Sequence, residues 1–260
     1  MTVIDFPARQ KGNALDKAQD KVNDAWDANT VKDRVRLAKE ALEISPLCAD
    51  ALVILAKHSR TANAALKHYK KAVKAAEEAL GDQFEELKGA FWGFMETRPY
   101  MRARAGLAET LRELEQTEEA AAHYAAMLEL NPNDNQGIRY LLATCLLETQ
   151  QHDDLRKLLD QYPDDCDAIW GYTRLLLEYR TSGASPGLDQ YLESALEANE
   201  HIPAFLANPT LLPKELPPFM TMGGEDQAAI YVSENANTWA ETDGAVEWLT
   251  SAVAAKKTKA

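Results

Sequence analysis

Positive charge, cysteine and long hydrophobic runs are all scarce in this sequence of 260 residues. It has 28 lysines and arginines against 41 aspartates and glutamates, a formal net charge of −13 at pH 7. Nucleic acids and anionic lipid surfaces favour a positive protein surface, so we expect neither as a partner. The longest apolar run, residues 141–147, is interrupted by Thr144 and is far shorter than the ~20 residues that cross a bilayer. We therefore expect no membrane insertion.

The few cysteines indicate a reducing compartment. Cys48, Cys145 and Cys166 are an odd number and form no CxxC pair. The N-terminus lacks the apolar stretch and small-residue cleavage site of a secretory signal, so the expected localisation is cytoplasmic. Cys145 lies inside the apolar run and is expected to be buried as a small hydrophobic residue.

Signatures of catalysis and of metal or cofactor binding are also missing. The five histidines are scattered, without an HExxH arrangement. The acidic run Asp164-Asp165-Cys166-Asp167 lacks the glycine and the bidentate glutamate of a calcium loop, so turn and cap chemistry explains it better. No GxGxxG, GxxxxGK[ST] or GxSxG motif occurs. We expect no catalytic residue, no metal site and no cofactor.

Strong helix formers dominate the composition. Alanine occurs 42 times and leucine 32 times, whereas valine and isoleucine together occur 16 times. Glycine and proline together account for only 23 residues. Because alanine and leucine favour helix while β-branched residues favour strand, the composition predicts an all-α protein.

A period of about 34 residues recurs along the chain. Its clearest unit has small or apolar residues at fixed offsets, namely Leu107, Ala108, Leu111, Ala120 and Tyr124, followed by Pro132. Adding 34 twice reaches further apolar or small residues, among them Ile138, Leu141, Leu142, Cys145, Tyr172, Leu175 and Leu176. Such a period is typical of paired antiparallel helices that bury their apolar faces by stacking. It predicts a right-handed solenoid of about five helical hairpins over residues 14–200.

The flanking and inserted segments break this period. Residues 1–13 are expected to be disordered or extended, residues 201–224 to form a loop rich in proline and glycine, and residues 225–256 to form capping helices. Residues 83–98 form an aromatic insertion between the second and third units. Its aromatic side chains pack back onto the adjoining unit or form an exposed surface for dimerisation or a partner, and packing back is the more common outcome.

The period and its small-residue positions resemble the tetratricopeptide repeat family. Longer strings, including TRPYMRARAGLA at 97–108, NPNDNQGIRYLLATCLLE at 131–148 and GGEDQAAIYVSENANTW at 223–239, resemble soluble bacterial relatives of the suppression-of-tumorigenicity tetratricopeptide proteins. The narrower resemblance covers roughly residues 30–250. It implies a repeat scaffold without an assigned biochemical activity.

The tetratricopeptide resemblance also implies which side chains face the concave groove. Offsets carried over from the first helix of each unit select six candidate partner-binding residues: Arg102, Gln136, Arg139, Tyr140, Trp170 and Arg174. The same offsets place Gly106 and Glu109 on this face. Arginine pairs with carboxylate or phosphate and stacks on aromatic rings, and tryptophan and tyrosine are typical of interaction hot spots. The pattern indicates a groove for an acidic peptide or a free C-terminus.

One alternative competes with this interpretation. In it, the arginines Arg102, Arg139 and Arg174 pair with Glu109 and neighbouring carboxylates, and they only join adjacent units. A carboxylate clamp of the kind found in some tetratricopeptide proteins is disfavoured, because only Arg174 matches it and Glu109 would repel a carboxylate.

The sequence as a whole predicts a non-catalytic scaffold or adaptor that binds a protein or peptide segment. The alternatives are a self-assembling, homo-oligomeric protein and a regulatory subunit of an enzyme complex.

Overall fold

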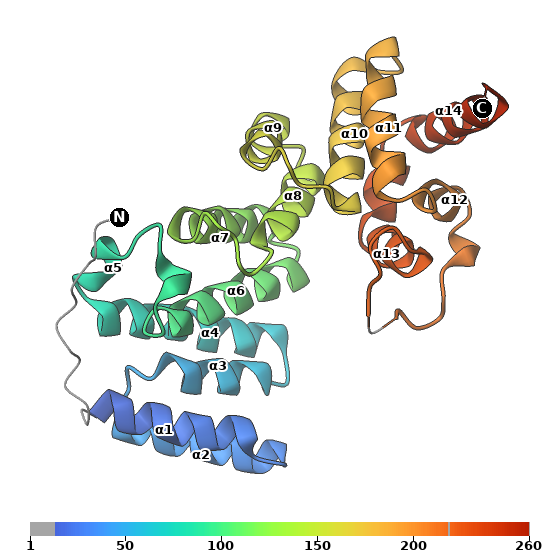
Figure 1. Ribbon diagram of the computed structural model, residues 1–260. Coiled ribbons are helices and arrows are strands. Elements are labelled where there is room, and N and C mark those ends of the chain that lie inside the picture. Colours follow the sequence, from blue (N-terminus) through green and yellow to red (C-terminus); the bar gives the residue numbers. More distant parts are fainter. Residues whose placement is uncertain (1–13, 218, 260) are drawn as a thin grey trace. The chain divides into compact units, whose positions relative to one another are not determined.

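The structure, a computed structural model, describes residues 14–217 and 219–259, so the expected N-terminal segment 1–13 lies outside the described residues. All regular elements within these ranges are helices (Figure 1). The prediction of an all-α fold is confirmed. In chain order the elements are α1 Ala14–Asp27, α2 Val31–Ile44, α3 Ala49–Lys57, α4 Ala62–Leu80, α5 Gln83–Glu86, η1 Phe91–Gly93, α6 Arg98–Glu113, α7 Thr117–Leu130, α8 Ile138–Glu148, α9 His152–Gln161, α10 Ala168–Ser182, η2 Pro186–Leu188, α11 Asp189–Ala198, α12 Ile202–Ala207, η3 Pro209–Leu211, α13 Glu225–Ala240 and α14 Ala245–Lys259.

The chain divides into two compact units. The first ends at Ile138 and the second begins at Arg139, at the start of α8. The sequence predicts a solenoid of about five units over residues 14–200 with an insertion at 83–98, and the division lies inside that range, after the insertion. Each unit is described below by itself.

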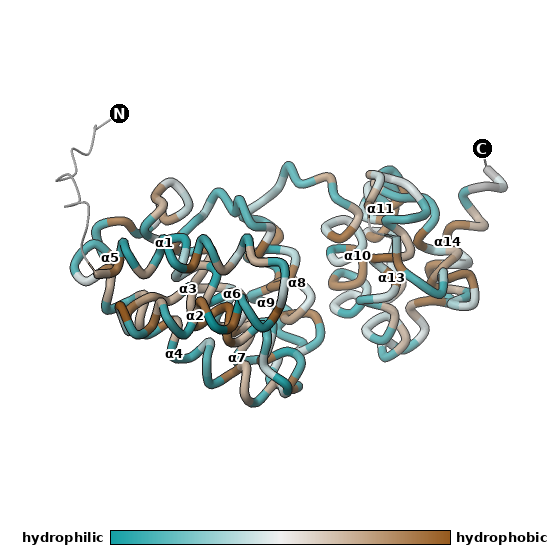
Figure 2. Tube along the Cα trace, turned by 90° about the horizontal axis from the view of Figure 1, so that it is seen from below, coloured by the Kyte–Doolittle hydropathy of each residue, from teal (hydrophilic) through white to brown (hydrophobic). Residues whose placement is uncertain are grey.

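Three helical hairpins build the first unit. Helix α1 packs on α2, α3 on α4, and α6 on α7, and these hairpins stack in chain order through α2 on α3 and α4 on α6 (Figure 1). They correspond to the first three predicted units. Teal and brown stretches alternate along these helices in Figure 2, as expected for helices that bury one face and expose the other.

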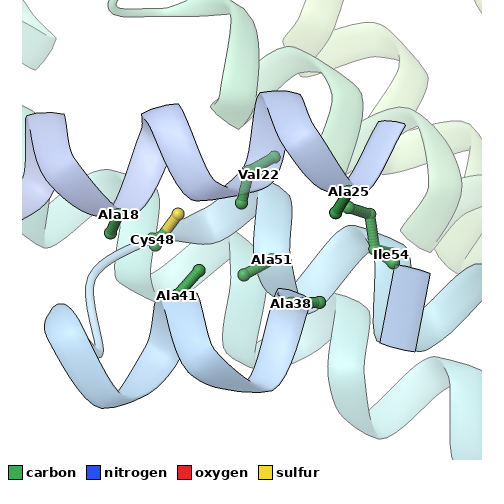
Figure 3. Packing of buried hydrophobic residues seen from close by; sticks show 8 residues of the cluster. All are labelled: Ala18, Val22, Ala25, Ala38, Ala41, Cys48, Ala51 and Ile54. Carbon is green, nitrogen blue, oxygen red and sulfur yellow. The ribbon is translucent and has the colours of Figure 1, made fainter. Parts of the chain in front are cut away.

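Small side chains bring the first helices close together. Eight buried residues of α1, α2, α3 and the turn before α3 form one core cluster, and five of the eight are alanines. Figure 3 shows their side chains in the space between the three helices: Ala18, Val22, Ala25, Ala38, Ala41, Cys48, Ala51 and Ile54. Leu15 and Trp26 pack against the cluster from its edge.

Two glycines mark close helix crossings. A Cβ atom on Gly106 of α6 would overlap the ring of Tyr69 on α4, and one on Gly171 of α10 would lie 3.2 Å from the Cα of Ala195 on α11. Gly106 is buried and faces α4, whereas the sequence offsets place it in the groove. The absence of a side chain at these points allows each pair of helices to pack closely.

The turns between paired helices repeat with a different period from the one predicted. The amide of Gln116 donates to the carbonyl of Leu111, and that of Gln151 donates to the carbonyl of Leu146, each at 2.9 Å. The residues before the two donors, Glu115 and Gln150, both have positive φ, 60° and 56°. Because the two turns are 35 residues apart rather than 34, the predicted positions on α8 are shifted by one residue.

The aromatic insertion packs back onto the first unit. Phe91 is fully buried, and the rings of Phe84, Phe91 and Tyr100 contact one another edge to face with centroids 5.1–5.8 Å apart. The Thr97 hydroxyl donates to the carbonyls of Phe91 and Phe94 and holds the turn closed. The structure thus shows the more common of the two outcomes expected for this segment.

In the second unit, α10 packs on α11, and α12 packs on both α13 and α14. The segment predicted as a loop, residues 201–224, differs from that expectation because it contains α12 and η3. Pro203 and Pro209 lie in the first turn of these two elements, where a missing N–H breaks no hydrogen bond. The remaining residues, from Leu212 onward to Gly224, have no helix in their described part.

A buried polar network ties this segment to α10 and α13. The side-chain amide of Asn199 donates to the carbonyl of Gly224 and to the side chain of Gln227, and Gln227 donates to Asp167 at the start of α10. Burial raises the pKa of Asp167, because a carboxylate loses hydration there. Buried amide groups are costly when unpaired, so this network fixes both ends of the segment.

Candidate functional site

The six predicted site residues are distributed over both units. Arg102 lies on α6, and Gln136 lies in the turn before α8, in the first unit. Arg139 and Tyr140 on α8 and Trp170 and Arg174 on α10 lie in the second unit. Gln136 was expected on the first helix of its hairpin and is not helical, because α8 begins two residues later.

In the first unit, Arg102 pairs with a fully buried carboxylate. Its Nε donates to Asp50 Oδ1 at 2.9 Å and its Nη2 donates to Asp50 Oδ2 at 2.6 Å, while Gln19 Nε2 donates to Oδ2 at 3.1 Å. These three residues come from α6, α3 and α1, so the network joins all three hairpins. A buried carboxylate requires such a partner, and the Nε and Nη2 donors of Arg102 are therefore used by the fold.

A pocket of about 420 Å³ lies beside this ion pair. Leu15, Trp26, Leu47 and Met95 form apolar walls, and Gln19 and Asn23 of α1 add side-chain amides. We call this cavity the first-unit pocket. Its combination of apolar walls with a few polar groups is typical of ligand sites in proteins.

In the second unit, Arg139 is held between aromatic rings. Its guanidinium lies 4.3 Å from the ring centroid of Tyr140 and 5.2 Å from that of Tyr162. Its Nε donates to Asp165 Oδ2 at 2.6 Å, and the Asp165 side chain is only 7% exposed. Arg139 also donates to the hydroxyl of Tyr140, whose pKa is raised by burial and by the neighbouring Asp165. The arrangement favours a structural role for this arginine.

Trp170 connects this aromatic cluster to α10. The indole is buried, its Nε1 donates to the carbonyl of Tyr162 at 3.0 Å, and its ring meets those of Tyr140 and Tyr162 edge to face. Trp170 is therefore almost completely buried, and its main contacts are with other residues of the second unit.

Arg174 differs from the other two arginines because its partner is exposed. It donates to Asp160 Oδ1 at 2.9 Å, and the Asp160 side chain is 62% exposed. Exposed ion pairs contribute only about 0–1 kcal/mol, so the pair with Asp160 restrains Arg174 weakly. Among the three predicted arginines, Arg174 has the most exposed carboxylate partner.

Arg174 borders a pocket of about 360 Å³ between α10 and α11. Trp170 and Pro163 form its apolar side, and Gln190, Tyr191 and Ser194 of α11 supply polar groups. We call this cavity the second-unit pocket. It contains two of the six predicted residues, Trp170 and Arg174.

The sequence interpretation missed the acidic partners. One alternative paired the arginines with Glu109 and neighbouring carboxylates, and the carboxylate partners in the structure are Asp50, Asp160 and Asp165. A signal was available for Asp50, which is the only charged residue in the apolar stretch from Ala49 to Ala56. Asp160 and Asp165 carried no comparable signal, because their proximity depends on how α9 and α10 meet.

Metal chemistry finds no support in the geometry. Across residues 14–217 and 219–259, no group of three or more histidine, cysteine, aspartate or glutamate side chains is placed to hold a metal ion. None of the helices described is long and apolar enough to span a membrane. Cys48 and Cys145 are buried, the latter as predicted, and Cys166 is exposed.

Comparisons with known sequences all find the same protein family. The sequence model of a family described as ST7 protein matches residues 11–257. A protein ST7 homolog of Drosophila pseudoobscura pseudoobscura is 28% identical over 274 residues, which cover 92% of this chain and 49% of that protein. The human suppressor of tumorigenicity 7 protein-like is 26% identical over 251 residues, covering 86% of this chain and 43% of that protein. The chain thus spans about half the length of the curated relatives it matches.

Among solved structures, the chain is similar to YrrB, described as a TPR protein with an unusual peptide-binding site. The TM-score is 0.51 at 18% sequence identity, and the alignment covers 69% of this chain and 85% of YrrB. At this identity the likeness concerns the fold, an array of tetratricopeptide-like helical hairpins.

Proposed function

The chain belongs to the ST7 protein family, as its resemblance to suppression-of-tumorigenicity proteins predicted, and we propose that it is a non-catalytic scaffold that binds an acidic peptide segment in the second-unit pocket. None of the three cysteines forms a disulfide, which supports a reducing, cytoplasmic location as part of the proposal. Of the six predicted residues, Trp170 and Arg174 would contact the peptide, while Arg102, Arg139 and Tyr140 would hold the helices.

One observation carries this proposal, the weak restraint on Arg174. Its guanidinium borders a cavity, and its one carboxylate partner within residues 14–217 and 219–259 is the exposed Asp160. A peptide carboxylate that replaces Asp160 would form a charge-assisted hydrogen bond inside a partly enclosed site, worth about 1.5–3 kcal/mol. The hydroxyls of Tyr191 and Ser194 and the amide of Gln190 would bind the peptide backbone, because these groups both donate and accept.

Gln136 has no assigned contact with a ligand in this proposal. Its side-chain oxygen is buried without a hydrogen-bond partner among the described residues, and it belongs to the first unit rather than to the second-unit pocket. Its role as a partner-binding residue therefore remains a prediction from the sequence offsets.

A peptide selection tests the proposal. A random peptide library displayed on phage is selected against the protein, and selected peptides are synthesised with a fluorescent label for anisotropy titration. We expect enrichment of aspartate and glutamate, and Arg174→Glu should weaken binding by about tenfold to a hundredfold, the equivalent of one charge-assisted hydrogen bond.

Lys157→Glu is the matched control for this experiment. Lys157 lies on α9 in the same unit, is largely exposed and pairs with exposed Asp154. Lys157→Glu and Arg174→Glu change the net charge of the protein by the same amount, because each replaces a positive side chain with a negative one. It should leave peptide affinity unchanged. Equal binding by Arg174→Glu and the unmodified protein would refute the second-unit pocket as the peptide site.

A further inference from the structure

The second unit exposes an unusual concentration of large hydrophobic side chains. Nine such side chains are exposed in the described part of the chain, and five of them lie within twelve positions of one another in sequence. They are Leu211, Leu216, Phe219, Met220 and Met222, with Phe219 84% exposed. We call residues 211–217 and 219–222 the apolar loop. A concentration of exposed apolar side chains of this kind is typical of an interaction site, because their exposure to water is unfavourable.

Both ends of the apolar loop are anchored. At one end the Asn208 side chain accepts from the amide of Thr210 and caps η3. At the other end the amide of Thr221 donates to Asp226 Oδ2, and the amide of Gly223 donates to Gln227 Oε1, each at 2.8 Å. The exposed apolar side chains therefore belong to a segment that hydrogen bonds hold at both ends.

The first-unit pocket is a concave surface with apolar walls. Leu15 and Trp26 rest on the core cluster of α1 to α3, so the apolar walls are fixed by the fold. Met95, another of the nine exposed hydrophobic side chains, forms its rim. An apolar ligand in the pocket would therefore cover the exposed side chain of Met95.

The polar groups of the pocket suit an extended chain. Asn23 of α1 carries a side-chain amide that can bind both the N–H and the C=O of a peptide backbone, and Gln19, one helical turn before it, contributes its amide oxygen as an acceptor because its Nε2 donates to Asp50. The Nη1 of Arg102 makes no hydrogen bond within residues 14–217 and 219–259, since only Nε and Nη2 hold Asp50. It remains able to donate to a backbone carbonyl or a carboxylate.

The sequence of the apolar loop fits such a pocket. Leu216, Phe219 and Met222 are spaced by three, so an extended polyproline-type conformation, with three residues per turn, would align them along one edge. Proline-containing segments in this conformation bind grooves lined by aromatic residues, and Trp26 supplies such a wall. The exposed Lys214 of the loop also has the opposite sign to Glu96 of the pocket.

We propose that the apolar loop of one copy of this protein binds in the first-unit pocket of a second copy. In a heterologous arrangement of this contact, one copy keeps its pocket free and the other keeps its loop free for further partners. Association therefore continues beyond a dimer, as a ring or an open array. This self-association uses a surface separate from the second-unit pocket and does not depend on the proposed peptide binding.

Complementation between two variants tests the proposal. The double variant Leu216→Ser/Phe219→Ser removes the apolar contact of the loop and changes only exposed side chains. Asn23→Arg places a larger side chain at the pocket on an exposed helical position. Sedimentation velocity from micromolar to millimolar concentration should show a rising mass for the unmodified protein and a monomer for each variant alone. An equimolar mixture of the two variants should form a one-to-one dimer, because each supplies the surface that the other lacks.

Val31→Ser is the matched control, since Val31 is an exposed hydrophobic residue on α2 outside the pocket, and this variant should associate normally. Arg174→Glu should also associate normally, so failure of peptide binding and failure of self-association are distinguishable. A monomeric unmodified protein at all concentrations overturns the proposal, as does undiminished association of the loop variant or a mixture that stays monomeric. Binding to phosphatidylcholine vesicles that the loop variant loses would assign the loop to lipid instead, and would also overturn it.

Discussion

Arg102 holds the fully buried carboxylate of Asp50 through two parallel hydrogen bonds of 2.9 and 2.6 Å, from a position 52 residues further along the chain. The pair lies between the second and third hairpins, and Gln19 extends it to the first. Adjacent hairpins of a repeat protein are stabilised mainly by their interfaces, so a buried ion pair that spans them affects the whole unit.

Arg102→Met should strongly destabilise the first unit, because it leaves the buried Asp50 carboxylate without its cation. We expect a loss of about 3–5 kcal/mol in the free energy of unfolding, measured by urea titration with circular dichroism. The double variant Arg102→Met/Asp50→Leu should recover part of this loss. Arg36→Met is the control, since Arg36 pairs only with exposed Asp33 and Glu40, and a loss as large as that of Arg102→Met would contradict the argument from burial.

Gly106→Ala should loosen the packing of α6 on α4. The added methyl group would overlap the ring of Tyr69, and overpacking of this kind costs about 1–3 kcal/mol. Gly93→Ala should be close to neutral, because a Cβ there meets no atom within 4 Å. Thermal unfolding compares the two variants. In a Tyr69→Leu background the cost of Gly106→Ala should shrink, and an unchanged cost would show that the ring is not its cause.

Three histidines should make the protein less stable in mild acid. Burial lowers the pKa of His68, His123 and His152 below the ordinary value near 6.5, and each has a buried ring nitrogen without a partner in the described structure. The unfolded chain then binds protons that the folded chain does not, so the free energy of unfolding is greatest above pH 6.5 and falls as the pH drops below it.

Urea titrations at several pH values between 5.5 and 7.5 measure this slope. His123→Gln should flatten it, because one of the three groups that take up a proton on unfolding is removed. Neighbouring Arg104 and Lys70 act in the same direction as burial on the His123 pKa, while Glu119 opposes them. A slope identical in the variant and the unmodified protein would contradict this assignment.

Arg180→Met should release the end of α13 in the second unit. The guanidinium donates to the carbonyls of Leu147 and Thr238 and to the Thr242 hydroxyl at 2.8–3.0 Å, and no carboxylate pairs with it in the described ranges. Burial lowers its pKa, and the C-terminal turns of α8, α10 and α13, with their partial negative charge, stabilise the cation instead. The cost should be about 3 kcal/mol, because the carbonyls lose charged donors.

Hydrogen exchange monitors this loss locally, with faster exchange expected in the last turns of α13 and in the turn to α14. Lys157→Met is the control on an exposed position of the same unit. Unchanged exchange near Thr238 in Arg180→Met would show that the three hydrogen bonds contribute little.

The sequence by itself determined the helical fold and its hairpins. Alanine and leucine favour helix, and a spacing near 34 brings Leu107, Leu142 and Leu176 to equivalent places in successive repeat units, so local preference and repeat period agree. Both signals are short in range, and neither requires knowledge of which side chains meet. The family followed from the same strings of residues.

Only the tertiary structure decided what each candidate arginine does. Arg102, Arg139 and Arg174 look alike in the sequence, but their carboxylate partners lie at positions 50, 165 and 160 and differ in exposure from fully buried to largely exposed. The strength of an ion pair depends on burial and geometry, which arise from packing between helices and not from spacing along one helix. For the same reason the two pockets, the division at Ile138 and the anchoring of the apolar loop by Gln227 became visible only in three dimensions.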